Sequence, residues 1–342
     1  MNLRKSYYIF IGIACLLASL LVYADNGKLF HSDKLSSSLI NCVVQDRYGF
    51  IWVGTDFGLS RFDGYRFVNY RHDKNDTTSI LDNIITEFHV DKQGRLWIGS
   101  AKGLMRYDYH GNCFVRYPFP DNRSPRVYSI IENRKGDVLI GSAGYGLYSV
   151  RKGTDYLRRE KEYCPKDSNL FYTHIFEDTH GDLWQSSHLP MFYRFHRQNI
   201  GKMLITPYDS PKGAPVAFFQ QRSNALMIVC MHGILYYDFP TGKLLDAGYD
   251  FGRYEEVTIN SATFDHLGNL YLGTSESGVL WAPNGSKSIV PYVNQNELRF
   301  SLANSWVNDI IEDKDNNLWI ACYKKGLYLI NNQEQAFNSW NF

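Results

Sequence analysis

The 342-residue sequence lacks an excess of charge of either sign. Lys and Arg total 36 and Asp and Glu total 35, which gives a formal net charge of +1 at pH 7. No basic run or stripe occurs, so the chain shows no sign of a nucleic-acid partner. After residue 24 it also lacks an apolar run long enough to cross a bilayer, and we expect no membrane span there.

Patterns that would support catalysis or metal binding are missing as well. The histidines do not form a short, metal-spaced cluster, and no nucleophile stands in a recognisable setting with a base. We therefore expect no enzyme activity, no metal and no other cofactor. Five cysteines follow residue 24, and most lie in strand-like segments: Cys42, Cys113, Cys164, Cys230 and Cys322. We interpret them as small buried apolar residues, with a disulfide framework as the alternative.

What the sequence has in abundance is one recurring phrase. Residues 43–55, VVQDRYGFIWVGT, show it clearly: an apolar run, Asp and a glycine turn, an apolar segment with Trp, then Gly-Thr. The large residue after the turn marks seven copies at intervals of 42 to 48 residues: Trp52, Trp97, Leu139, Trp184, Met227, Tyr271 and Trp319. Copy five is the most degenerate, with Arg-Ser-Asn at residues 222–224 in place of the turn. A fixed period of this size indicates a repeat architecture.

Each copy consists of short apolar runs bounded by Gly, Asp and Asn, which is typical of β-strands. In the first copy we expect strands at residues 40–45, 50–54, 59–63 and 66–70. Four strands per copy and seven copies predict an all-β fold, a seven-bladed β-propeller with four antiparallel strands per blade. The predicted repeats are 39–80, 81–126, 127–170, 171–214, 215–257, 258–305 and 306–342.

Closure of the ring needs a strand from one end of the chain, because an open ring would expose sheet edges. Residues 28–33 resemble the fourth strands of the early copies, and we expect them to complete the last blade. Residues 336–340 are the alternative.

The N-terminal segment is typical of an export signal. Arg4 and Lys5 precede an apolar stretch, and small residues stand at Val22 and Ala24, where a signal peptidase would cut. We predict a signal peptide at 1–24, the propeller at 25–342 and a periplasmic location. An uncleaved membrane anchor and a lipoprotein at Cys15 are the alternatives.

Acidic residues recur at the start of the turn in five copies: Asp46, Asp91, Asp178, Asp265 and Asp313. Because they repeat with the fold, we expect their carboxylates to cap the backbone of the Asp-x-x-Gly turn, not to form a unique site.

The repeat, Asp-x-x-Gly-x-Leu-Trp-(Ile/Val)-Gly-(Thr/Ser)-x-x-Gly-Leu-x-Arg-(Phe/Tyr)-Asp, resembles the two-component regulator propeller repeat. The block at residues 40–67 is similar to the start of the periplasmic sensor half of Bacteroides-type hybrid two-component systems. The resemblance implies a propeller that senses oligosaccharide breakdown products. In that family two propellers precede a β-sandwich, a membrane helix, a histidine kinase, a receiver and a DNA-binding domain. This sequence ends at Phe342 after the seventh copy, so we expect either a fragment of such a sensor or a free-standing propeller, and no kinase residue is carried over.

Candidate binding residues follow from propeller geometry. The loops between strands two and three and those between blades open on one face, whereas the Asp turns lie on the other. Residues that vary between copies on the first face are Asp56, Lys102, Arg126, Tyr145, His188, His232, Tyr254, Glu276, Trp306, Tyr323 and Lys324, with Phe57, Arg123 and Arg253 beside them. Aromatic rings could stack on a sugar while amides and charges bond to its hydroxyls, and the cations also suit uronate or sulfate groups. Any of these could instead be a solvated loop residue, and Trp306 could pack between blades six and seven.

The leading functional prediction is a periplasmic sensor propeller that binds an oligosaccharide. One alternative is a protein-interaction propeller that docks to a second propeller or forms a homodimer. The other is a propeller lyase or glycosidase.

Overall fold

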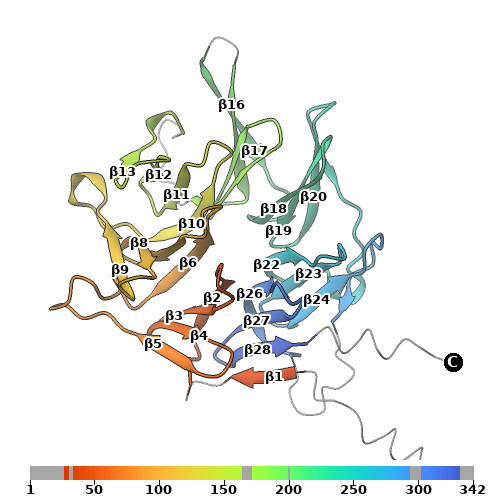
Figure 1. Ribbon diagram of the computed structural model, residues 1–342. Helices are drawn as coiled ribbons and strands as arrows, with labels where there is room; N and C mark the ends of the chain where they lie inside the picture. Colours follow the sequence, from red (N-terminus) through yellow and green to blue (C-terminus); the bar gives the residue numbers. More distant parts are fainter. Residues whose placement is uncertain (1–26, 31–33, 164–171, 199–200, 293–301, 332–342) are drawn as a thin grey trace, which may run out of the picture.

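Seven four-stranded antiparallel sheets stand around a central axis, with one strand of each sheet at the axis (Figure 1). The computed structural model describes residues 27–30, 34–163, 172–198, 201–292 and 302–331. Within these ranges the other regular elements are single 3₁₀ turns, η1 (Pro120–Asn122), η2 (Lys161–Tyr163) and η3 (Gly252–Tyr254). The predicted seven-bladed β-propeller is confirmed.

The first four blades take their strands in chain order from the axis outward. They are β2 (Ile40–Gln45), β3 (Ile51–Thr55), β4 (Gly58–Phe62) and β5 (Phe67–Tyr70); β6 (Ile85–Val90), β7 (Leu96–Ser100), β8 (Gly103–Asp108) and β9 (Cys113–Tyr117); β10 (Val127–Glu132), β11 (Val138–Ser142), β12 (Gly146–Val150) and β13 (Leu157–Arg159); and β14 (Tyr172–Glu177), β15 (Leu183–Ser187), β16 (Met191–Arg197) and β17 (Met203–Asp209). The strands expected in the first copy differ from these bounds by one residue at most.

Blades 5 to 7 follow the same order, except that the last outer strand comes from the N-terminal side. They are β18 (Pro215–Arg222), β19 (Ala225–Cys230), β20 (Gly233–Asp238) and β21 (Lys243–Asp246); β22 (Ile259–Phe264), β23 (Leu270–Thr274), β24 (Val279–Ala282) and β25 (Val290–Pro291); and β26 (Trp306–Glu312), β27 (Leu318–Tyr323), β28 (Gly326–Ile330) and β1 (Gly27–Phe30).

Strand β1 closes the ring by pairing antiparallel with β28, from Gly27 opposite Ile330 to Phe30 opposite Leu327. The Phe30 ring is 3% exposed and lies 5.1 Å from the Phe62 ring of blade 1. The expected N-terminal latch is therefore confirmed over the described residues 28–30. Residues 31–33 of that prediction, and the alternative segment 336–340, lie outside the described residues.

The second strand of each blade is buried on both faces, as its apolar sequence predicts. Every residue of β3, for example, is buried. In blades 1, 2, 3 and 6 this strand has a glycine near its end, and at Gly54 and Gly273 the next blade approaches too closely for a side chain. A Cβ on Gly54 would lie 2.6 Å from the Ile85 side chain of β6, and a Cβ on Gly273 would lie 2.7 Å from the Val307 side chain of β26. The hydroxyl that follows the glycine closes the next loop, as where Thr55 Oγ1 donates to the Gly58 carbonyl at 2.8 Å.

The recurring aspartate caps its turn as expected and also accepts a hydrogen bond from a buried side chain. Asp178 Oδ1 accepts the backbone N–H groups of His180 and Asp182, at 2.8 and 3.0 Å. Its second oxygen accepts the indole N–H of Trp184 at 2.8 Å. Indole donation to the turn aspartate recurs from Trp52, Trp97 and Trp319. In blade 3, where Leu139 has no donor to offer, the turn residue is the neutral Asn133.

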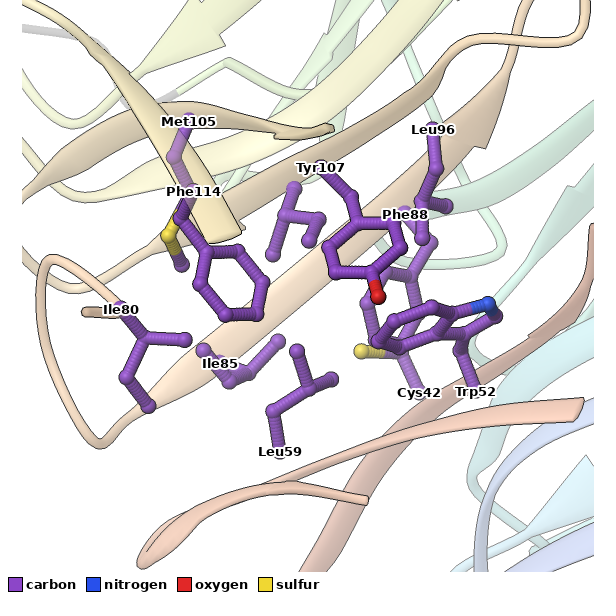
Figure 2. Close-up of a cluster of buried hydrophobic side chains, with 11 residues drawn as sticks. Cys42, Trp52, Leu59, Ile80, Ile85, Phe88, Leu96, Met105, Tyr107 and Phe114 are labelled. Atoms are coloured by element: carbon purple, nitrogen blue, oxygen red, sulfur yellow. The ribbon is translucent and has the colours of Figure 1, made fainter. Parts of the chain in front are cut away.

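Apolar side chains between neighbouring blades form the core. Figure 2 shows the seam between blades 1 and 2, where Trp52 and Tyr107 meet with ring centroids 4.6 Å apart. Three of the described cysteines, Cys42, Cys230 and Cys322, are buried, and none of the four described cysteines forms a disulfide. Cys164 lies outside the described residues.

Candidate ligand-binding site

All seven inner strands carry a register shift near the same end. In β2 the pairing with β3 jumps from Ile40 to Cys42, so that Asn41 is an extra residue. The same irregularity occurs in β6, β10, β14, β18, β22 and β26. Bulges of this kind re-aim side chains. Here they place one residue per blade around the end of the channel on which the strand two–three loops open.

Four of these extra residues link one blade to the next. Each side chain donates to a first-strand carbonyl of the following blade: Asn41 Nδ2 to Ile85 O at 2.9 Å, Thr86 Oγ1 to Val127 O at 2.7 Å, Asn260 Nδ2 to Val307 O at 3.1 Å, and Asn308 Nδ2 to Ile40 O at 2.8 Å. The amides therefore have a structural role, and recognition of a ligand must rely on other groups beside them.

A hollow of about 310 Å³ opens at this mouth of the channel. It is lined by residues from six positions around the ring: Asn41, Thr86, Arg126, Tyr128, Val216, Met231, Ile259, Asn260, Trp306 and Asn308. Arg126 is the one charged residue of this lining, and its guanidinium carbon lies 5.5 Å from the Tyr128 ring centre. Trp306 is 48% exposed and donates its indole N–H to Asn308 Oδ1 at 2.8 Å. The lining thus offers one cation, exposed aromatic surface and amides.

The residue after the bulge lies further along each inner strand. In three blades this residue is titratable (Glu87, His174 and Asp309), and together the three add little charge to the channel at neutral pH. Burial, and then the nearby Asp309 carboxylate, raise the pKa of Glu87 to about 8. Burial lowers the pKa of His174 to about 4, so that its ring is neutral. Burial raises the pKa of Asp309 to about 6, against the effect of its hydrogen bonds from the Val43 and Ile310 amides. Asp309 is therefore ionised at pH 7, but two backbone donors compensate it.

The structure brings some of the predicted site residues together. Arg126 and Trp306 line the hollow. The Trp306 and Tyr323 ring centroids lie 5.9 Å apart, and Lys324 Nζ lies 5.6 Å from the Tyr323 ring centre. Trp306 begins strand β26 instead of lying in a loop, and about half of its surface is exposed.

Other predicted residues lie outside the lining of this hollow, with local partners of their own. Lys102 Nζ lies 2.9 Å from Asp82 Oδ2, and Asp56 Oδ1 accepts from Asn41 Nδ2 at 2.8 Å. The remaining members face solvent wholly or in part: Tyr145, which stacks under Arg123 at 4.7 Å, Tyr254, which accepts from Arg253, and His188, His232 and Glu276. Their roles stay predictions.

Sequence reasoning missed the inner-strand residues of the mouth. It searched the loops, whereas Asn41, Thr86, Tyr128, Asn260 and Asn308 belong to first strands. A signal was present, since each of these residues directly follows an aliphatic residue near the start of its strand. The sequence pattern identifies a channel residue only when the bulge is known, because the bulge turns that side chain toward the axis.

Two further observations concern chemistry. Among the residues that the structure describes, no three His, Cys, Asp or Glu side chains are grouped so that they could hold a metal ion. The same part of the chain has no helix whose length and apolar character would let it cross a membrane.

Comparison with known proteins gives one family match. The model of the two component regulator propeller family matches residues 34–57, 79–102 and 301–324. These stretches contain the first strand, the turn and most or all of the second strand of blades 1, 2 and 7. A curated relative, "Histidine kinase P4" of Formosa agariphila, is 48% identical over 48 residues, which are 14% of this chain and 4% of the relative.

Solved structures with the same architecture include sensors and enzymes. The extracellular domain of a putative hybrid two component system from B. thetaiotaomicron superposes with a TM-score of 0.74 at 20% identity, over 89% of this chain and 42% of that one. The extracellular domain of a putative one component system from the same organism gives 0.68 at 19%, over 90% and 40%. The virginiamycin B lyase of Staphylococcus aureus gives 0.65 at 13%, over 89% and 98%. At these identities the likeness shows the fold, and the chain spans less than half the length of the two sensor domains.

Proposed function

Because this chain carries two-component regulator propeller repeats, we propose that it is the ligand-sensing propeller of a two-component signalling system and binds an oligosaccharide fragment. It would act in the periplasm, exported by residues 1–24, and pass the signal to a kinase through the rest of a longer sensor. The comparisons that support this proposal are those with the extracellular sensor domains.

The observation that carries the ligand proposal is the make-up of the hollow at the channel mouth. A sugar ring has an apolar C–H face, which would stack on the half-exposed Trp306 indole, and a polar edge that needs donors and acceptors. Arg126, directly before strand β10 of blade 3, and the Tyr128 hydroxyl beside it would supply these. The residues come from different blades, so a bound saccharide would contact several blades at once.

Binding would be tested on the full chain by isothermal titration calorimetry. The probes are a panel of neutral glucose and xylose oligomers, oligogalacturonides and sulfated galactose oligomers. For the probe that binds, Trp306→Ala and Arg126→Gln are each expected to weaken binding by about tenfold or more, because each removes a contact worth more than about 1.4 kcal/mol.

A triple variant provides the matched control on the same face. Tyr145→Ala, His232→Ala and Lys324→Ala together leave the lining of the hollow intact. If this variant abolishes binding while Arg126→Gln and Trp306→Ala retain it, the ligand site lies on the outer loops and the channel-mouth assignment is wrong. If no oligosaccharide of the panel binds, the sensing proposal itself fails in favour of the protein-interaction alternative.

A further inference from the structure

The seams between blades are normally filled by the chain's own aromatic rings on the side of the Asp turns. Between blades 1 and 2, Trp52 packs against Tyr107 (Figure 2). The Tyr109 hydroxyl donates to Asp46 Oδ2 at 2.9 Å. Between blades 4 and 5, Trp184 meets Tyr237 with centroids 4.9 Å apart. These two seams therefore each accommodate more than one large ring.

The seam between blades 5 and 6 has lost these rings. Met227 stands where Trp52 does in blade 1, and Ala225 stands at a place that is aromatic in blade 1 alone, as Phe50. On the facing blade, the strand register places Ala282 at the position of Tyr107. Two positions further along the chain, Asn284 replaces Tyr109. Non-aromatic side chains thus occupy the places of Trp52, Tyr107 and Tyr109 at this seam.

A hollow of about 270 Å³ lies at this seam, beside Met227 and Ala225. Apolar or aromatic side chains form much of its wall: Phe219, Met227, Tyr236 and Leu245. The other copy without an aromatic ring, at Leu139, also borders a hollow, but that one is lined mainly by charged residues and contains ion pairs such as Arg158 with Glu160 at 2.8 Å. Loss of the ring accounts for both hollows, and the seam of blades 5 and 6 is the one with an apolar wall.

The rim of this hollow favours an anion. Arg222 and Lys287 lie on the rim against one carboxylate, Asp238, whose Oδ2 already accepts from the Thr241 amide and hydroxyl. Lys287 donates to the Ala247 carbonyl and lies 5.8 Å from the Tyr236 ring centre. An acidic group at the mouth would therefore meet two cations while the rest of the ligand remains in the apolar part.

We propose that this hollow is a second ligand site, which takes a small planar aromatic molecule that bears a carboxylate. The shape argument is that the chain's own indole and phenol rings occupy the equivalent space at other seams. The energetic argument is that an unfilled apolar hollow forfeits packing, and apolar cavities of this kind are known to bind aromatic molecules. The site lies on the face of the Asp turns and does not depend on the channel mouth or on oligosaccharide binding.

The test uses indole-3-carboxylate as the probe, with the full chain in isothermal titration calorimetry and thermal unfolding. We expect one molecule to bind per chain and to raise the unfolding midpoint. Cyclohexanecarboxylate, which has the charge without the flat ring, and uncharged indole should each bind at least about tenfold more weakly. Lys287→Met should weaken binding of indole-3-carboxylate toward that of indole, with Arg222 still on the rim.

Refilling the seam provides the decisive variant. Met227→Trp restores the side chain that other copies carry, and we expect it to abolish probe binding and raise the unfolding midpoint of the free protein. Leu139→Trp makes the same change at the other seam and should leave probe binding unaltered. Ala225→Phe serves the same purpose if Met227→Trp does not fold. The proposal is overturned if wild-type protein does not bind the probe at concentrations up to about 10 mM. It is also overturned if the Met227→Trp protein binds the probe as tightly as wild type does.

Discussion

Removal of the turn aspartate of blade 4 should reveal how much the carboxylate–indole contact stabilises a blade. Asp178 and Trp184 are both 0% exposed, and the carboxylate accepts three hydrogen bonds. In Asp178→Ala the indole N–H becomes a buried donor without a partner, at a cost of about 1–3 kcal/mol. The two turn amides add roughly 0.5–1.5 kcal/mol each. We therefore expect the free energy of unfolding to fall by about 2–6 kcal/mol.

The matched control is the same substitution at the same place in blade 3. Asn133 accepts from the amides of Lys135 and Asp137, but Leu139 offers no indole. Asn133→Ala should therefore cost only the turn part, roughly 1–3 kcal/mol. The comparison isolates the indole contact, because the turn geometry is otherwise the same.

The assay is urea unfolding followed by circular dichroism, with a double-mutant cycle of Asp178→Ala and Trp184→Phe. The cycle should give a coupling energy of roughly 1–3 kcal/mol, since Trp184→Phe removes the donor that Asp178→Ala leaves unpaired. The reasoning is refuted if Asp178→Ala costs no more than Asn133→Ala, or if the two substitutions at blade 4 are simply additive.

Two further predictions concern closure and pH. Phe30→Ala in strand β1 should destabilise the propeller by about 3–5 kcal/mol, because removal of this side chain, which is 3% exposed, leaves a cavity between blades 7 and 1. Tyr65→Ala is the control, because the Tyr65 side chain is 97% exposed. Equal unfolding midpoints for the two variants would disprove the latch. Burial raises the pKa of Glu87 in the folded state to about 8. Between pH about 4.5 and 8 the carboxyl therefore ionises in the unfolded state but stays protonated in the folded state, and the free energy of unfolding of wild type falls as pH rises. Glu87→Gln removes this titration, so its stability relative to wild type should increase over the same range. Urea midpoints at pH 4 and pH 9 measure the effect, and parallel profiles for the two proteins would contradict the assignment.

Much of the fold could be predicted because the repeat is local. The glycine turn, the buried second strand and the closing hydroxyl each depend on neighbours within a few residues, so a single copy shows them. The resemblance to two-component regulator propellers, stated from the same residues, is confirmed by the family match at three stretches. Even the N-terminal latch could be predicted, since residues 28–30 look like a fourth strand that lacks its blade.

The candidate site could be predicted only in part. The search for variable residues on one face found Arg126 and Trp306, but it could not tell them from Lys102 or Tyr145, which have partners of their own. Whether a loop residue points toward the axis or outward depends on blade tilt and on the neighbouring blade. The repeat pattern in the sequence specifies neither the blade tilt nor the contacts with the neighbouring blade.

The sequence by itself determined the number of blades, the order of strands and the residues that cap each turn, because these follow from patterns repeated within each copy. Tertiary structure alone decided three features that the proposals and the pH prediction use: the bulges that turn Asn41 and its equivalents to the channel, the buried setting that raises the pKa of Glu87, and the hollow beside Met227. Each arises where two or more blades meet. The degenerate fifth copy has Met227 at the Trp position, and only the tertiary structure shows that a hollow lies beside it.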